Sequence, residues 1–290
     1  MKSTIAVYNA FTKEPGKGNP AAVILDAKDL SDKEMQEIAY KAGYNESAFV
    51  LPSEQADIRL RFFSPGQEMN LCGHATVASI YALFSKGMLD KNHISIETNA
   101  GILAVNVYKE NEEIKVYMEQ SPYEEVLFNG DRSMLAKALG IQEENLEESY
   151  PIVYGYTGLW TLLVPIKKLS TFEKMKPHNA LFPEVLSQNN RASVHPFCME
   201  TVSQNAKLHG RHFSSPFSGT VEDPVTGTAS GVMGAYYMKH ILKNKHQKIE
   251  INIEQGHEIG REGLVEVIVE HKEVTEHVRI SGTAVFEKEI

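Results

Sequence analysis

Three short motifs occur twice, in the same order, along this chain of 290 residues, and they constrain its fold more than any other feature. The first motif contains an Arg, a Phe and a Ser-Pro pair. The second is a small residue and a Gly that precede a run of helix-forming residues. The third is an apolar strand that begins with Gly. The matched segments are 61–65 with 211–216, 72–76 with 226–230, and 101–105 with 263–267. Short strings containing Gly match by chance, but three matches in one order favour an ancient duplication. We therefore expect two similar halves of α+β class.

Local patterns predict the elements of the first half. Ser31 and Glu34 have the spacing of a capping box at the start of an amphipathic helix, and Gly43 suits its C′ position. Apolar and polar residues alternate over 57–62, which indicates a half-buried strand. The remaining expectations are strands over 4–8, 21–25 and 48–51, a tight turn at 18–20, and a helix over 75–86 that ends at Gly87.

The duplication predicts where a ligand binds. We expect an N-terminal half over 1–120, completed by a strand at about 277–290, and a C-terminal half over 121–276. The cleft between two such halves is a natural ligand site. Each Gly-led helix start exposes backbone N–H groups and the positive end of a helix dipole, which suit a substrate carboxylate.

Composition excludes several classes of function. The net charge is −9 and no basic block is present, so a nucleic-acid partner is disfavoured. Cys72 and Cys198 are the two cysteines and form no CxxC pair, which disfavours a zinc ribbon and a disulfide scaffold. The N-terminus does not resemble a signal peptide, and no stretch approaches the roughly 18 apolar residues of a membrane span. We expect a cytoplasmic protein with no membrane partner.

Three side chains are candidates for chemistry, and each also has an ordinary structural interpretation. Glu46 follows a predicted helix and precedes an apolar strand, so its carboxylate is either partly buried for proton transfer or a surface turn residue. Asp223 precedes Pro224, which is typical of a turn, but it also lies beside the helix start at Gly227. His74 occupies the first helix start, where a lone histidine is more often structural than catalytic.

Cofactor and metal motifs are missing from the sequence. It has no GxGxxG after a first strand, no GxxxxGK[ST] phosphate loop and no GxSxG nucleophile elbow. The histidines show neither HxH nor HxxxH spacing, which would place two ligands on one element. We therefore expect no cofactor and no metal.

Taken together, the motifs resemble the PhzF-like family, the phenazine-biosynthesis isomerase relatives of the diaminopimelate epimerase-like fold. The matching segments run in family order over nearly the whole chain: GNPAAV (18–23), NESAFV (45–50), FFSPGQEMNLCGHAT (62–76), EDPVTGTASG (222–231) and EQG with GREG (254–263). The resemblance implies two pseudo-twofold halves, each a mixed β-barrel-like sheet around a central helix. It also implies a homodimer.

The same resemblance implies the site. Glu46 matches the family's proton-transferring carboxylate, and His74, Asp223 and Thr228 match polar residues around the substrate. Thr228 departs from the serine expected there, and its methyl group narrows the pocket. The remaining substrate-binding positions are Asn19, Gly73, Ala75 and Gly227. The implied activity is a cofactor-independent isomerisation of a small carboxylate-bearing metabolite, such as a dihydro-hydroxyanthranilate, in which a carboxylic acid relays a proton between carbons.

Two alternatives remain open. An amino-acid epimerase or racemase of this fold uses two cysteines, and Cys72 matches the first position, but the second is Thr226, which cannot form a thiolate. A non-catalytic protein that binds small carboxylates needs only the helix amides, and the combination of Glu46, His74 and Asp223 argues against it. The physiological substrate cannot be derived from the sequence.

Overall fold

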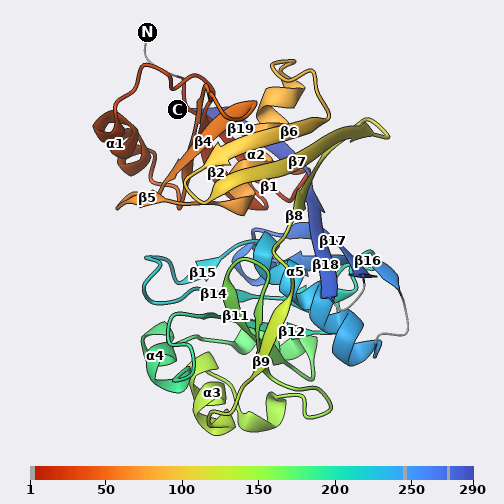
Figure 1. Cartoon of the computed structure of the whole chain (residues 1–290). Coiled ribbons are helices and arrows are strands. Elements are labelled where there is room, and N and C mark those ends of the chain that lie inside the picture. Colours follow the sequence, from red (N-terminus) through yellow and green to blue (C-terminus); the bar gives the residue numbers. More distant parts are fainter. Residues whose placement is uncertain (1–3, 244–246, 273–274) are drawn as a thin grey trace. The chain divides into compact units, whose positions relative to one another are not determined.

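The computed structural model describes residues 4–243, 247–272 and 275–290 (Figure 1). It is a mixed α+β structure that divides into two compact units. Unit 1 comprises Met1–Glu119 with Ser281–Ile290, and unit 2 comprises Gln120–Ile280. In the described ranges, no helix is both long enough and apolar enough to cross a membrane.

Unit 1 is built from a mixed set of paired strands. Neighbours pair in the order β19-β1-β2-β3-β4-β6-β7-β8, with β2/β3 and β4/β6 parallel and the other pairs antiparallel, and β5 forms a hairpin with β4. The strands are β1 (Ala6–Ala10), β2 (Asn19–Ile24), β3 (Ser47–Leu51), β4 (Ile58–Phe63), β5 (Glu68–Met69), β6 (His93–Thr98), β7 (Gly101–Glu110), β8 (Glu113–Glu119) and β19 (Ala284–Glu289).

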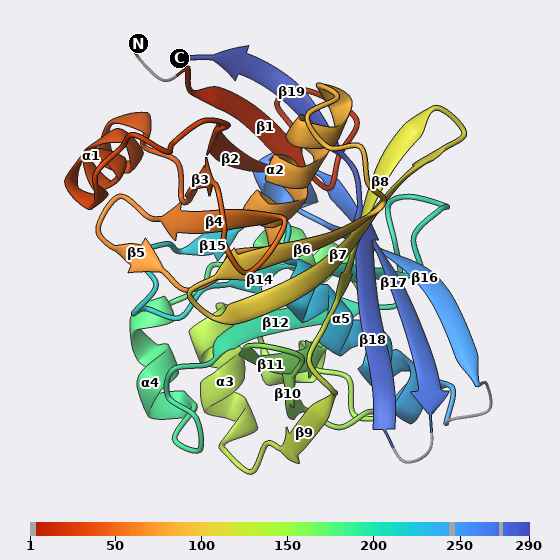
Figure 2. The same cartoon turned by 45° about the horizontal axis from the view of Figure 1, so that its top comes forward.

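Helix α2 (Gly73–Ser85) is the centre of unit 1. It contacts strands near both ends of that order, namely β19 and β1 on one side and β7 and β8 on the other, so the strands curve around it (Figures 1 and 2). Nine of its thirteen residues are buried, which is the pattern of a helix enclosed on most sides. The helix begins two residues before the predicted start at Ala75, which places Gly73 and His74 in its first turn.

Helix α1 (Asp32–Ala42) confirms the predicted capping box. The Ser31 backbone N–H donates to Glu34 Oε2 at 2.8 Å, and the Glu34 N–H donates to Ser31 Oγ at 3.3 Å. Gly43 ends the helix at a φ of 70°, a left-handed conformation that glycine adopts without steric cost.

The turn predicted at 18–20 is wrong for its last two residues. Gly18 turns the chain with a φ of 65°, but Asn19 and Pro20 already belong to β2. Parallel pairing of β2 with β3 begins only at Ala22. Pro20 therefore lies where one edge of the strand is still unpaired, which is where a strand tolerates proline.

Unit 2 has a second mixed arrangement. Strands pair in the order β9-β10-β11-β12, β12 pairs with both β13 and β14, β15 pairs with β14, and β13 continues to β16 and β17. The strands are β9 (Glu124–Leu127), β10 (Val153–Tyr156), β11 (Trp160–Pro165), β12 (Ser193–Cys198), β13 (Leu208–Gly210), β14 (His212–Phe213), β15 (Glu222–Asp223), β16 (Lys248–Gln255), β17 (Gly263–Lys272) and β18 (Thr275–Gly282), whose last two residues belong to unit 1.

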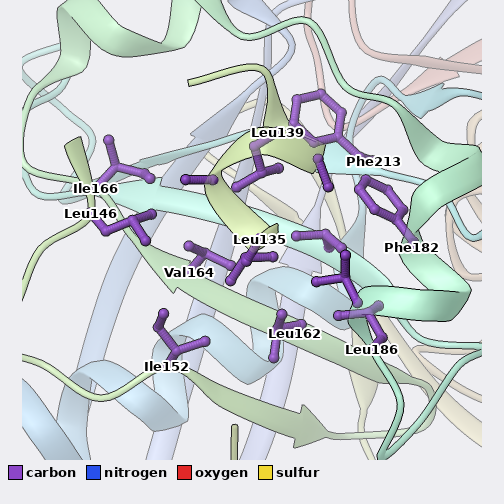
Figure 3. Close-up of a cluster of buried hydrophobic side chains, with 14 of the residues drawn as sticks. Leu135, Leu139, Leu146, Ile152, Leu162, Val164, Ile166, Phe182, Leu186 and Phe213 are labelled. Carbon is purple, nitrogen blue, oxygen red and sulfur yellow. The ribbon is translucent and has the colours of Figure 1, made fainter. Parts of the chain in front are cut away.

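The helices of unit 2 cover these strands. Helix α5 (Gly227–Tyr236) is buried almost throughout, packs against β10, β11 and β17, and continues as a π-helical turn over Tyr237–Ile241. Helices α3 (Arg132–Leu139) and α4 (Phe182–Val185) enclose an apolar core that includes Leu135, Leu139, Leu162 and Phe182 (Figure 3). Short 3-10 turns occupy Glu143–Asn145, Leu169–Lys174, Asn179–Leu181 and His257–Ile259.

Candidate active site

The start of α2 presents free backbone donors. Cys72 is the N-cap residue, with extended backbone (φ −143°, ψ 116°) and no side-chain capping bond. The first intrahelical bond runs from the Thr76 N–H to the Cys72 carbonyl at 3.0 Å. The N–H groups of residues 73–75 therefore have no carbonyl within the helix to donate to, and they lie at the positive end of its dipole. An anionic group of a ligand suits this position.

Glu46 brings a carboxylate to this helix start. It lies immediately before β3, and its carbonyl accepts the Ala22 N–H at 3.3 Å, which ties it to β2. Its Oε2 lies 3.3 Å from His74 Nε2, and the two side chains are 22% and 8% exposed. The pair is thus largely shielded, but the carboxylate remains reachable from solvent.

Cys72 completes a group of three. Its Sγ lies 3.5 Å from His74 Nδ1 and 3.8 Å from Nε2. Burial raises the pKa of the Cys72 thiol, so the sulfur is protonated at neutral pH. Burial lowers the pKa of His74, but its interactions with Cys72 and Glu46 outweigh burial and hold that pKa well above the ordinary 6.5. Cys72 and Glu46 therefore both contribute to the raised pKa of His74.

The start of α5 is organised by hydrogen bonds. Thr226 is the N-cap, again extended (φ −115°, ψ 101°) and without a side-chain capping bond to the helix. Its hydroxyl donates to Asp223 Oδ2 at 2.5 Å. Gln255 binds both residues, because its Nε2 donates to the Asp223 carbonyl at 2.7 Å and its Oε1 accepts the Thr226 N–H at 3.1 Å. Asp223 and the first turn of α5 are therefore held in one fixed arrangement.

A hairpin with an Arg–Glu pair precedes each helix start. In β4–β5, Arg61 donates from Nε and Nη2 to the two carboxylate oxygens of Glu68 at 2.7 and 2.9 Å. In β14–β15, Arg211 makes the same two contacts with Glu222 at 2.8 and 2.7 Å. Bidentate pairs of this kind fix geometry as well as adding energy. Glu222 directly precedes Asp223, so this clamp also positions the site residue.

The remaining predicted residues are divided between the two units. Asn19 is fully buried at the start of β2, and Ala75 is fully buried in the first turn of α2. Thr228 is partly exposed, and its carbonyl accepts the Thr157 hydroxyl at 3.0 Å. Unit 1 brings Glu46 and His74 together, whereas Asp223, Gly227 and Thr228 belong to unit 2. Their binding roles stay predictions.

Gln255 was missed as a site residue. Its signal was the segment EQG at 254–256, which was noted as a motif without a role for its glutamine. A residue 29 positions from Thr226 becomes its partner only through the pairing of β16, which a single sequence does not display.

A second ionisable cluster was also missed. His209 is fully buried, and both of its ring nitrogens contact carboxylates. Its Nδ1 lies 2.8 Å from Glu254 Oε1, and its Nε2 lies 2.9 Å from Glu258 Oε1. His257 Nε2 lies 3.5 Å from Glu254. Burial lowers the pKa of His209, but the two carboxylates outweigh it and raise that pKa. The cluster is an internally paired charge network in unit 2.

Known proteins are similar to this chain over nearly its whole length. The family model described as phenazine biosynthesis-like protein, PhzC-PhzF, matches residues 8–289. A Bacillus subtilis protein named uncharacterized isomerase YfhB is 54% identical over 98% of this chain and 97% of its own length. Trans-2,3-dihydro-3-hydroxyanthranilate isomerase of Pseudomonas fluorescens is 29% identical over 96% of this chain and 95% of its own.

Solved structures extend the likeness. A Bacillus anthracis protein of the PhzF family superposes with a TM-score of 0.97 and 48% identity, covering 100% of this chain and 99% of that one. A hydroxyproline epimerase from Agrobacterium vitis superposes with a TM-score of 0.61 at 14% identity, covering 99% and 91%. This second likeness shows that the chain shares its fold with that epimerase.

Proposed function

Because this chain belongs to the PhzC-PhzF family of phenazine biosynthesis-like proteins, as its motifs indicated, we propose that it is an isomerase that moves a proton within a small carboxylate-bearing metabolite. Relatives covering nearly the whole chain are named isomerases. The observation that carries the proposal is the Glu46 carboxylate, 3.3 Å from a buried histidine in the first turn of a helix.

Glu46 is the proposed proton carrier. Its carboxylate removes a proton from one carbon of the substrate, and the electron pair of that C–H bond moves into the conjugated system. The same carboxylic acid then returns the proton to another carbon of the same molecule. Atoms balance without an oxidant or a co-reactant, and Glu46 ends in its starting state. One group that serves as base and then acid suffices for such a transfer.

His74 is the proposed positioning partner. Its raised pKa favours the imidazolium, which donates a hydrogen bond from Nε2 to Glu46. This contact holds the carboxylate in one orientation before the proton is taken. Reactions of a positioned group gain from this fixed orientation.

The helix starts are the proposed anchors. N–H groups at Gly73 and Ala75 suit the substrate carboxylate, because no carbonyl of the helix accepts them and they lie at its dipole-positive end. Asp223, Gly227 and Thr228 are proposed to bind polar groups of a substrate. The Asp223 carboxylate accepts hydroxyl or amino protons, and the Thr226 hydroxyl and Gln255 hold it in place. We also propose that the protein is a cytoplasmic homodimer. Sedimentation equilibrium tests the dimer, and cell fractionation tests the location.

Solvent deuterium tests the reaction. The protein is incubated in D₂O with trans-2,3-dihydro-3-hydroxyanthranilate first, and then with other small unsaturated carboxylic acids, and NMR follows new C–D bonds and shifted double bonds. We expect one compound to isomerise and Glu46→Gln to stop it. Full turnover by Glu46→Gln on that compound refutes the proposed role of Glu46.

The structure disfavours the two-cysteine epimerase. Burial raises the pKa of Cys72, which opposes the thiolate that such a reaction needs, and the Thr226 hydroxyl is engaged with Asp223. Inversion at a substrate α-carbon with deuterium uptake would support the epimerase. Tight binding of a carboxylic acid with no exchange would support a binding protein.

A further inference from the structure

Three different donor atoms converge at the start of α2. Glu46 Oε2, Cys72 Sγ and a ring nitrogen of His74 all lie within 4.8 Å of one another. We propose that they form a zinc(II)-binding site that competes with proton transfer. A thiolate, an imidazole and a carboxylate are together the ligand types that zinc takes in proteins.

The spacing of the donors fits a tetrahedral ion. Zinc bonds of about 2.3 Å to sulfur and about 2.0–2.2 Å to nitrogen and oxygen place the nitrogen about 3.4 Å from the oxygen and about 3.6 Å from the sulfur. In this structure, His74 Nε2 lies 3.3 Å from Glu46 Oε2 and 3.8 Å from Cys72 Sγ. These two pairs stand close to the spacing that the ion requires, and the Glu46 oxygen and the Cys72 sulfur lie within 4.8 Å of each other. Three protein ligands leave the fourth position of the ion for water or an anion.

In the described part of the chain, a second cluster has donor atoms that are already engaged in close contacts. His209, Glu254 and His257 also offer three donors within 4.8 Å. However, both ring nitrogens of His209 already contact carboxylates at 2.8 and 2.9 Å, and Glu254 accepts the backbone N–H groups of Val202 and Ser203. These donors satisfy one another, whereas the α2 donors stand at distances that leave room for an ion between them. The second cluster therefore serves as an internal control.

Binding of zinc changes the protonation of the site. The Cys72 S–H bond breaks as the Zn–S bond forms, and any proton on His74 Nε2 also leaves, so that up to two protons pass to solvent. Affinity therefore rises with pH. The 22% exposure of Glu46 gives the ion a route, while His74 and Cys72 are 8% and 9% exposed.

The bound ion excludes the proposed reaction. It occupies the Glu46 oxygen and the His74 nitrogen that proton transfer uses, so the metal acts as an inhibitor and not as a cofactor. The competition rests on the proposed function, whereas binding of the ion requires no substrate and is measured without turnover.

Cobalt(II) titration of the full-length chain tests the site. A thiolate ligand produces a sulfur-to-cobalt charge-transfer band in the near ultraviolet, a tetrahedral site produces visible ligand-field bands, and zinc(II) abolishes both by displacement. Cys72→Ser is expected to abolish the charge-transfer band and to weaken zinc binding at least about 100-fold, since losing even an outer partner of a ligand costs 10–100-fold. Cys198→Ser is the matched control, and His257→Gln controls for the second cluster.

The outcomes separate clearly. Bands that persist in Cys198→Ser and His257→Gln but disappear in Cys72→Ser support the site. No cobalt or zinc binding at millimolar metal, or bands lost only in either control, overturns it. If Cys72→Ser fails to fold by circular dichroism, Glu46→Gln decides, because it keeps the charge-transfer band while zinc binding weakens at least about tenfold. Unweakened binding in Glu46→Gln refutes the three-donor site.

Discussion

The starts of α2 and α5 have similar backbone conformations but different side-chain chemistry. Cys72 and Thr226 are both extended N-cap residues without a side-chain capping bond to the helix, and each is followed by a glycine and a largely buried helix. At α2, the contacts among Glu46, Cys72 and His74 span 3.3–3.8 Å. At α5, those joining Asp223, Thr226 and Gln255 span 2.5–3.3 Å.

This difference separates two tasks. Loosely arranged titratable groups exchange protons and accept ligands, whereas a closed hydrogen-bonded network fixes a carboxylate in one place. The start of α2 is therefore suited to proton transfer, and the start of α5 is suited to holding a polar group of a ligand. The following variants test that division, beginning with the largest expected effect.

The sharpest contrast is between Glu46→Gln and Asp223→Asn. Removing the proton carrier is expected to lower kcat by about 10²–10⁴-fold, the usual contribution of general acid–base catalysis. Asp223→Asn keeps the shape of the hydrogen-bonded network, so we expect this variant to change KM more than it changes kcat. Steady-state kinetics on the substrate found by deuterium exchange measure both. If kcat of Asp223→Asn is as low as that of Glu46→Gln, the two helix starts do not have different roles.

The two hairpin clamps predict unequal losses of stability. Arg211 and Glu222 are 7% and 12% exposed, so Arg211→Met leaves a buried carboxylate and costs about 3–5 kcal/mol. Glu68 is 28% exposed and keeps a hydrogen bond from Asn99, so Arg61→Met costs about 1–2 kcal/mol. Urea unfolding followed by circular dichroism compares them. The single tryptophan, Trp160 in β11, reports on unit 2 and should respond to Arg211→Met alone.

Thr226→Val tests the closed network at α5. The substitution removes the hydroxyl that donates to Asp223 while keeping the side-chain shape, and it should destabilise by about 1–2 kcal/mol. Thr226→Ser retains the hydroxyl and should restore most of the loss in the same urea experiment. Equal stability of the Val and Ser variants would show that the bond to Asp223 contributes nothing.

The smallest effect concerns the titration of His74. Its folded pKa is raised, so its contribution to stability is complete below 6.5 and is lost as pH rises through the folded pKa. Glu46→Gln removes one of the two partners that raise this pKa, so we expect the pKa to fall while the contact with Cys72 remains. NMR titration of the His74 ring protons measures the change. An unchanged pKa in Glu46→Gln would show that Glu46 does not hold the charge on His74.

Local features were predictable from the sequence, and long-range contacts were not. The α1 capping box depends on residues three apart, so its pattern is complete within one stretch. The role of Glu46 came from resemblance to a family, because its approach to His74 depends on how β3 and α2 pack. Gln255 and the His209 cluster depend on pairing of β16 with β13. At Asn19 and Pro20 a turn pattern gave way to strand pairing with β1.

The strand β19 has a consequence for the closure of unit 1. It pairs along the whole of β1, so that Ala6 and Glu289 become neighbours. Unit 2, in contrast, is one continuous stretch over 120–280. Because the entropic cost of closing a loop grows with its length, the pairing of β1 with β19 requires the largest chain closure among the strand pairs of unit 1.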